Sequence, residues 1–161
     1  IPTQGSAVTR VADNSSQTSL QSKNLLGATS GTLFLDFGNS NTDGTTWNDI
    51  LYLTANTNVN QSIKIVTDPN NYLRISTYNS STAATNYISS ISTTNAKVLF
   101  SWDATNLKIF INGGLASTLT IPSYAYNTFY LYDSNSSINI DSCQMYNVAT
   151  SDLDAILKTT I

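Results

Sequence analysis

The 161-residue sequence contains no histidine and no glutamate, and all ten of its acidic residues are aspartates. Histidine is a common general base and zinc ligand, and without it a serine or cysteine nucleophile lacks its usual activator. Glycoside hydrolases normally use a pair of Asp or Glu residues. Asp152 and Asp154 are close in sequence, but they fall at a predicted helix start, where negative charge favours the helix dipole. We therefore expect no enzymatic activity.

Cysteine and long apolar runs are also scarce. Cys143 is the single cysteine, so the chain can form neither an internal disulfide nor a cysteine metal cluster, and we expect a small residue buried in a strand. No apolar run approaches the roughly 20 residues that span a bilayer, so membrane insertion is not expected. The first residues, Ile1-Pro2-Thr3, include neither an initiator methionine nor a signal peptide, which indicates a segment of a longer protein.

Charged residues make up only 11% of the chain, and the formal net charge is −3. This balance lacks the basic excess that binds phosphate backbones, so nucleic acid is not an expected partner. Serine, threonine and asparagine, by contrast, contribute 22, 23 and 19 residues. Their hydroxyl and amide groups supply the hydrogen-bond donors and acceptors that sugars need. The composition therefore predicts a polar, weakly charged surface that suits carbohydrate.

Apolar and polar residues alternate through most of the chain, which is the pattern of half-buried strands. Segments with this pattern are 31–37, 50–54, 63–67, 72–76, 98–102, 107–111, 115–121, 128–132 and 138–146. Roughly ten to twelve short strands at this spacing predict an all-β fold, an antiparallel two-sheet jelly-roll sandwich, in one domain covering residues 1–161. Segments 38–48 and 78–95 are rich in Asn, Ser and Thr and are predicted to be surface loops.

Two turns join the strands of the second half into a three-stranded meander. Asp103-Ala104-Thr105-Asn106 predicts a hairpin, because Asp and Asn tolerate turn dihedrals and bond their own backbone. Asn112-Gly113-Gly114 predicts a second turn, in which glycine supplies a positive φ.

The C-terminal region combines a strand with a short helix. Alternation in 138–146 predicts one face with Ile138, Ile140, Ser142 and Gln144, and another with Asp141, Cys143 and Met145. Thr150 or Ser151 can cap a helix whose apolar stripe is Leu153, Ile156 and Leu157. We expect this helix to dock on the edge of the sandwich.

Several blocks of the sequence together resemble a known superfamily. These are Thr9-Arg10-Val11-Ala12-Asp13, the strand 31–37, the block 97–103 that ends in Trp102-Asp103, the strand and Asn-Gly turn 107–113, and the ending 145–153. Their order and spacing are similar to the concanavalin A-like lectin and glucanase superfamily in its laminin G or pentraxin-like form, as in receptor-binding domains of phage tail fibres. The absence of glutamate and the excess of Ser, Thr and Asn depart from that family and weaken the transfer of particular ligand contacts.

The resemblance implies a non-enzymatic receptor-binding domain in the distal part of a viral fibre, located on the virion surface, trimeric, and directed at host-surface carbohydrate. Three alternatives remain open. The chain is otherwise an extracellular carbohydrate-binding module of a bacterial protein, a structural decoration domain of a capsid or fibre, or a glycosidase. The last would require distant aspartates such as Asp133 and Asp141 to converge.

Sugar recognition combines an aromatic surface with directional polar groups. The candidate ligand-binding residues in loop contexts are Trp47, Tyr78, Asn79, Tyr87, Tyr124 and Tyr126, whereas Trp102 is assigned to the core. Lectin-like relatives often hold calcium, and the best oxygen-rich cluster is Asn39, Asn41, Asp43, Asn48 and Asp49. Within it, Asp43 and Asp49 are weak metal candidates. An ordinary polar loop is the preferred explanation of the cluster, and no other cofactor is expected.

Overall fold

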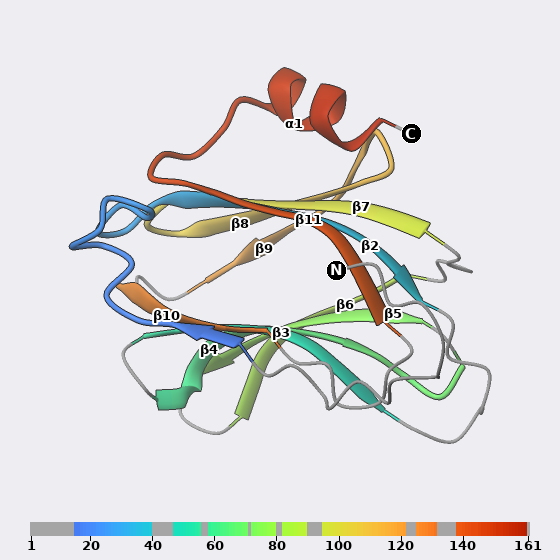
Figure 1. Cartoon of the computed structure of the whole chain (residues 1–161), viewed down its shortest axis with the longest axis horizontal. Helices are drawn as coiled ribbons and strands as arrows, with labels where there is room; N and C mark the ends of the chain where they lie inside the picture. The colour runs from blue at the N-terminus through green and yellow to red at the C-terminus, as the bar shows by residue number, and fades with distance from the viewer. Residues whose placement is uncertain are drawn as a thin grey trace, which may run out of the picture.

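The computed structural model describes residues 15–39, 47–55, 58–70, 72–79, 82–89, 95–121, 125–131 and 138–160. Within these residues, eleven strands form two antiparallel sheets that face each other, and a short helix lies outside one of them (Figure 1). The all-β, two-sheet jelly-roll sandwich predicted from alternation is confirmed.

The strands divide into a six-stranded and a five-stranded sheet. The six-stranded sheet has the order β1 (Ser15–Gln17), β10 (Tyr126–Leu131), β3 (Asn48–Ala55), β4 (Asn58–Thr67), β5 (Leu73–Asn79) and β6 (Thr82–Ser89). The five-stranded sheet has the order β11 (Ile138–Tyr146), β2 (Gly31–Asn39), β7 (Asn95–Trp102), β8 (Asn106–Ile111) and β9 (Gly114–Thr120).

The main core lies between the two sheets, where the inward side chains of alternating positions meet. Trp102 is 2% exposed, as its assignment to the core predicts, and its ring meets that of Tyr126 edge to face with centroids 5.8 Å apart. A Cβ atom added to Gly31 would lie 2.5 Å from Cζ2 of Trp102, so the indole fits closely against this glycine. The centre of the sandwich therefore has no spare space around its largest side chain.

Helix α1 (Asp152–Thr159) is capped by Ser151, whose hydroxyl accepts the N–H of Asp154 at 3.2 Å. It packs on the outer face of the five-stranded sheet over β7, β8 and β9, rather than on the edge of the sandwich (Figure 1). Its buried residues are Ala155 and Thr159. The predicted apolar stripe is therefore wrong in part, because Leu153 and Leu157 face solvent. No helix in the described part of the chain is long and apolar enough to cross a membrane.

Both predicted turns of the meander are confirmed. In the first, the Asp103 carboxylate accepts the backbone N–H groups of Thr105 and Asn106, which hold the pKa of Asp103 below its usual value. In the second, Asn112 and Gly113 both have positive φ, 47° and 84°, as a tight hairpin turn requires.

The segment 78–95 is not one loop, contrary to the prediction. β5 continues to Asn79, β6 occupies Thr82–Ser89, and β7 begins at Asn95. β6 pairs with β5 along its length and is the last strand of its sheet. Its Thr, Tyr and Ile residues favour strands, but the polar composition hid the alternation that a buried strand would show. In 38–48, β2 reaches Asn39 and β3 starts at Asn48, while 40–46 lie outside the described residues.

Strict alternation also fails in β11, because a bulge interrupts its pairing with β2 between Ile140 and Ser142. The extra residue, Asp141, exchanges the two faces of the strand. Ile140 and Met145 therefore both pack against the main core, although they were predicted on opposite faces. Cys143 lies in this edge strand as predicted, but it is exposed rather than buried.

Candidate functional site

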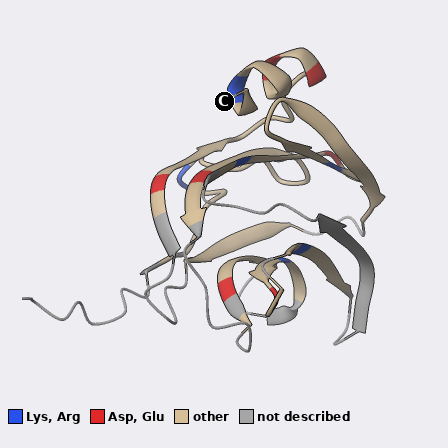
Figure 2. Ribbon diagram, turned by 90° about the vertical axis from the view of Figure 1, so that its right-hand side faces the viewer, with Lys and Arg blue, Asp and Glu red and all other residues tan. Residues whose placement is uncertain are grey.

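The outer face of the six-stranded sheet carries two clusters that each combine an aromatic ring, a cation and a carboxylate. The tryptophan cluster consists of Trp47, Arg74 and Asp68, and the tyrosine cluster of Tyr52, Lys64 and Asp49. Helix α1 lies on the other sheet, so no helix of the described residues covers this face (Figure 1). Figure 2 shows how few charged residues the ribbon carries, which makes the two clusters distinctive.

Asp68 is the buried anchor of the tryptophan cluster. Its carboxylate is 1% exposed and follows β4 in the turn to β5. Oδ1 accepts the backbone N–H groups of Asn70 and Tyr72, each at 2.9 Å, and Oδ2 accepts Nε and Nη2 of Arg74 at 2.8 and 2.7 Å. Burial alone raises the pKa of this carboxyl, but the backbone N–H groups and the guanidinium outweigh that effect and lower it. Asp68 is therefore ionised and fully occupied within the protein.

The guanidinium of Arg74 lies over the indole of Trp47. Its guanidinium carbon lies 5.0 Å from the ring centroid, and the Trp47 side chain remains 53% exposed. Asp68 takes the guanidinium edge formed by Nε and Nη2, so the edge formed by Nη1 and Nη2 points away from Asp68. That edge carries two parallel N–H donors beside an exposed aromatic ring, and both can donate hydrogen bonds to oxygens of a bound ligand.

The tyrosine cluster lies next to the tryptophan cluster. Asp49 and Arg74 both pair with Val66, from the two strands that flank β4. Lys64 Nζ lies 3.0 Å from Asp49 Oδ1 and 4.7 Å from the centroid of the Tyr52 ring. The two clusters together form one polar and aromatic surface with two cations and the Asp49 carboxylate, while the Asp68 carboxylate lies buried beneath it.

Burial and hydrogen bonds change the pKa values of Tyr52 and Lys64 in the tyrosine cluster. Burial disfavours the Tyr52 phenolate and raises the pKa of its hydroxyl to about 12, although the nearby Lys64 acts in the opposite direction. Burial also lowers the pKa of the Lys64 ammonium, but its hydrogen bonds to Tyr52 and Asp49 outweigh this effect and raise it. At neutral pH, Tyr52 is therefore a neutral hydroxyl and Lys64 a full cation.

The structure does not bring all predicted ligand residues together. Tyr78 pairs with Ser62 on β4, whereas the residue after Trp47 pairs with Thr67, so more than five residues of β4, over roughly 16 Å at the usual rise of a strand, separate the two positions along the sheet. Tyr126 is 2% exposed and packs on Trp102, so its ring belongs to the core instead of a binding surface. Tyr124 and the side chains of Asn79 and Tyr87 lie outside the described residues.

The described residues contain no group of three or more His, Cys or Asp side chains that could hold a metal ion. Of the two weak metal candidates, Asp49 is engaged with Lys64, and Asp43 lies outside the described residues. The aspartates at the start of α1 also have local partners. Asp152 pairs with Lys108 at 2.6 Å, and Asp154 accepts the Ser151 hydroxyl at 2.6 Å.

Sequence reasoning identified Trp47 but missed Arg74 and Asp68. The available signal was alternation: Leu73 and Ile75 are apolar and buried, so Arg74 between them must face outward. A turn containing Asp68-Pro69-Asn70 precedes it, and an Asp in such a turn commonly bonds backbone N–H groups two residues on. The contact between Arg74 and Trp47 depends on strand pairing and has no signature in the sequence.

No family model matches this chain, and no curated protein matches it in sequence. Solved structures do match in fold, and they include binding domains of botulinum neurotoxins. The serotype C1 binding domain has a TM-score of 0.67 and 16% identity, covering 89% of this chain and 39% of that chain. A type D/C binding domain in complex with rat synaptotagmin II has a TM-score of 0.66 and 14% identity, covering 89% and 38%.

A botulinum neurotoxin type C structure, concerned with interaction with two ganglioside molecules, gives a TM-score of 0.65 at 16% identity, covering 89% of this chain and 38% of that chain. The chain thus spans less than two fifths of the length of each of these structures. Identities this low show a shared β-sandwich fold alone.

Proposed function

We propose that this chain is a non-enzymatic receptor-binding domain that recognises host-surface carbohydrate as part of a viral tail fibre or a similar virion appendage. The tryptophan cluster is the observation that carries the proposal. An exposed indole offers a flat apolar surface to the C–H face of a sugar ring, and the free edge of the Arg74 guanidinium offers donors to its oxygens. Because Asp68 already fixes Arg74, little conformational entropy is lost on binding.

The fold comparison supports the general class of this proposal. The similar solved structures include toxin binding domains. The type C neurotoxin interacts with two ganglioside molecules, and a type D/C binding domain is in complex with rat synaptotagmin II. The sequence resemblance adds the finer parts: membership of the concanavalin A-like superfamily, a single domain in the distal part of a longer fibre protein, and a location on the virion surface.

Replacement of Trp47 by alanine is expected to weaken glycan binding at least about tenfold, because a central aromatic contact of an interface commonly contributes more than 1.4 kcal/mol. A glycan array would first identify a ligand of the wild-type chain, and titration calorimetry would then compare the variants. Leu115→Ala is the matched control, since Leu115 is 50% exposed but lies on the other sheet. Binding that is unchanged in Trp47→Ala would contradict the proposed site, and no bound glycan on the array would contradict the function.

The proposed fibre origin also implies a homotrimer. Light scattering across a dilution series is expected to give three times the 17.4 kDa mass of one chain. A single-chain mass at every concentration would instead favour a carbohydrate-binding module that acts as a monomer.

A further inference from the structure

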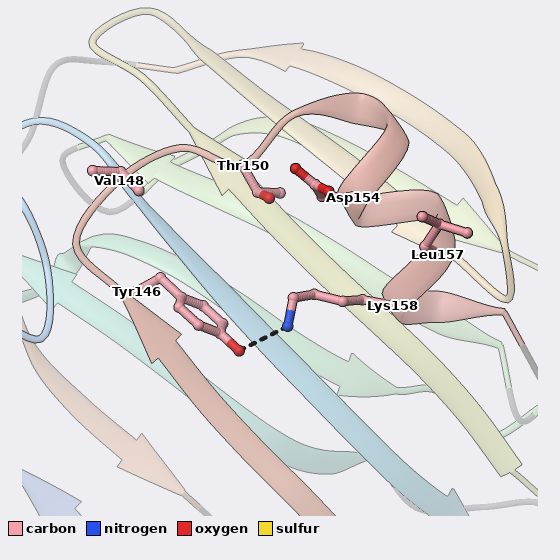
Figure 3. Close-up of a pocket in the computed structure, with 6 residues that line it drawn as sticks. All are labelled: Tyr146, Val148, Thr150, Asp154, Leu157 and Lys158. Carbon is pink, nitrogen blue, oxygen red and sulfur yellow. Dashed lines mark hydrogen bonds between the residues drawn. The ribbon is translucent and has the colours of Figure 1, made fainter.

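A hollow lies on the side of the sandwich opposite the tryptophan cluster, between α1 and the segment that connects β11 to it (Figure 3). Its volume is about 290 Å³, and it is lined by Tyr146, Val148, Thr150, Asp154, Leu157 and Lys158. Small-molecule pockets start at about 300 Å³, so this hollow has room for one small ring rather than for an extended chain. It lies on the outer side of the five-stranded sheet, away from the tryptophan cluster.

The polar groups of the hollow are held apart. Asp154 and Lys158 are one helical turn apart, in the order that normally favours an ion pair. No ion pair within the described residues joins them, because each has another partner. Asp154 Oδ2 accepts the Ser151 hydroxyl at 2.6 Å, and Lys158 Nζ donates to the Tyr146 hydroxyl at 2.8 Å (Figure 3). An anion and a cation therefore lie at different places on the wall of the hollow (Figure 3).

Two contacts with Tyr146 fix the position of Lys158. Its ammonium lies 4.7 Å from the centroid of the Tyr146 ring, and the Tyr146 hydroxyl in turn donates to Gln144 Oε1 at 2.5 Å. An ammonium has three N–H donors, of which this arrangement uses one. The Asp154 carboxylate likewise has a second oxygen, Oδ1, with lone pairs. The hollow thus offers donors at Lys158 and an acceptor at Asp154.

Apolar side chains border these polar groups. Val148 is 60% exposed and Leu157 is 65% exposed, and both line the hollow. Exposed apolar side chains that lie together, rather than singly, are typical of surfaces that contact a ligand or partner. Leu153, at 67% exposed, lies on the same helix and extends the apolar surface beside the hollow.

We infer that this hollow is a second carbohydrate site, which takes a single neutral pyranose ring. Sugar hydroxyls both donate and accept, so one ring can donate to Asp154 and accept from Lys158 while its C–H groups contact Val148 and Leu157. A neutral ring adds no net charge that must be desolvated. The inference rests on the proposed carbohydrate recognition, but it uses other residues on the other sheet.

Two sites on opposite outer faces would make one domain bivalent. The sheets of a sandwich are about 10 Å apart, so both sites cannot bind the same sugar ring. They can bind different branches of a surface glycan or neighbouring glycans, and the second contact then forms at a high effective concentration. Weak single sites would in this way give firm attachment to a glycan-covered surface.

The test uses two-dimensional NMR of the isotopically labelled chain with four probes: the methyl glycosides of glucose, galactose, mannose and N-acetylglucosamine, each titrated into the millimolar range. At least one of them is expected to shift amide signals of residues 146–158. Lys158→Met keeps the aliphatic stem but removes the donor, and it is expected to weaken this binding at least about fivefold, the worth of one lost hydrogen bond. Asp154→Asn is a second variant of nearly the same shape.

Lys23→Met is the matched control, because Lys23 is an exposed lysine that does not line the hollow. Melting curves of all variants establish that they are folded. Glycoside-dependent shifts in 146–158 that are lost in Lys158→Met and Asp154→Asn but kept in Lys23→Met would support the second site. If none of the four glycosides shifts these signals, or if both variants bind like the wild type, the second site is wrong. The proposed site at the tryptophan cluster is tested separately, by the glycan array and by ligand-dependent shifts of the Trp47 indole signal.

Discussion

Replacing Trp102 with alanine is expected to lower the free energy of unfolding by about 4 kcal/mol. Trp102 is almost completely buried between the sheets, contacts Tyr126 edge to face, and lies so close to Gly31 that no Cβ fits there. Deleting the indole removes buried apolar surface and leaves a cavity that the two sheets cannot close, because strand pairing fixes their backbones. A loss of this size is a large part of the stability of a domain.

Urea unfolding followed by circular dichroism measures this effect. Trp47→Ala is the matched control, since it removes the same side chain from an exposed position and is expected to change the free energy of unfolding by less than about 1 kcal/mol. If Trp102→Ala does not fold, Trp102→Phe retains part of the ring and is expected to give a smaller but measurable loss. Equal effects at Trp47 and Trp102 would show that the assignment of one indole to the surface and one to the core is incorrect.

The two-sheet fold could be predicted because most strands have one buried and one polar face. Alternation located the strands around Leu35, Ile65 and Phe100, and the turn residues at Asp103 and Gly113 fixed the meander. Alternation carried no information where polar residues dominate the sequence around a strand, as for β6, or where a bulge adds a residue, as at Asp141 in β11. In those strands, pairing with a neighbouring strand determines the conformation, and a single sequence does not show which strands pair.

The candidate sites were less predictable than the fold. Trp47 stood out as an aromatic residue in a polar segment, but its contact with Arg74 requires the start of β3 and the start of β5 to flank the end of β4. The hollow at α1 was missed because Leu157 was assigned to the buried stripe of the helix. In the structure, the smaller Ala155 and Thr159 face the sheet, over a cluster that includes Phe110, and the leucines remain outside.

Replacing Asp68 with asparagine is expected to remove about 3 kcal/mol of stability at neutral pH, because it leaves Arg74 without its buried counter-ion and weakens two backbone hydrogen bonds. The loss should depend on pH in a defined direction. The fold lowers the pKa of Asp68, so its contribution is complete above the unfolded-state value near 3.8 and disappears as the pH falls through the lower folded-state value. The stabilities of wild type and Asp68→Asn are therefore expected to converge in acid.

Urea unfolding at a series of pH values from neutral to acid provides the measurement, with Asp49→Asn as the control. Asp49 forms an ion pair on the same face, but its side chain is 37% exposed, so its loss is expected to cost less than about 1 kcal/mol. If Asp68→Asn is as stable as Asp49→Asn, Asp68 does not anchor the cluster. Because Asp68 holds the Arg74 guanidinium against Trp47, its replacement should also weaken glycan binding while Asp49→Asn weakens it less. If Asp68→Asn loses stability but keeps full affinity for the glycan, Asp68 stabilises the turn but does not contribute to glycan binding.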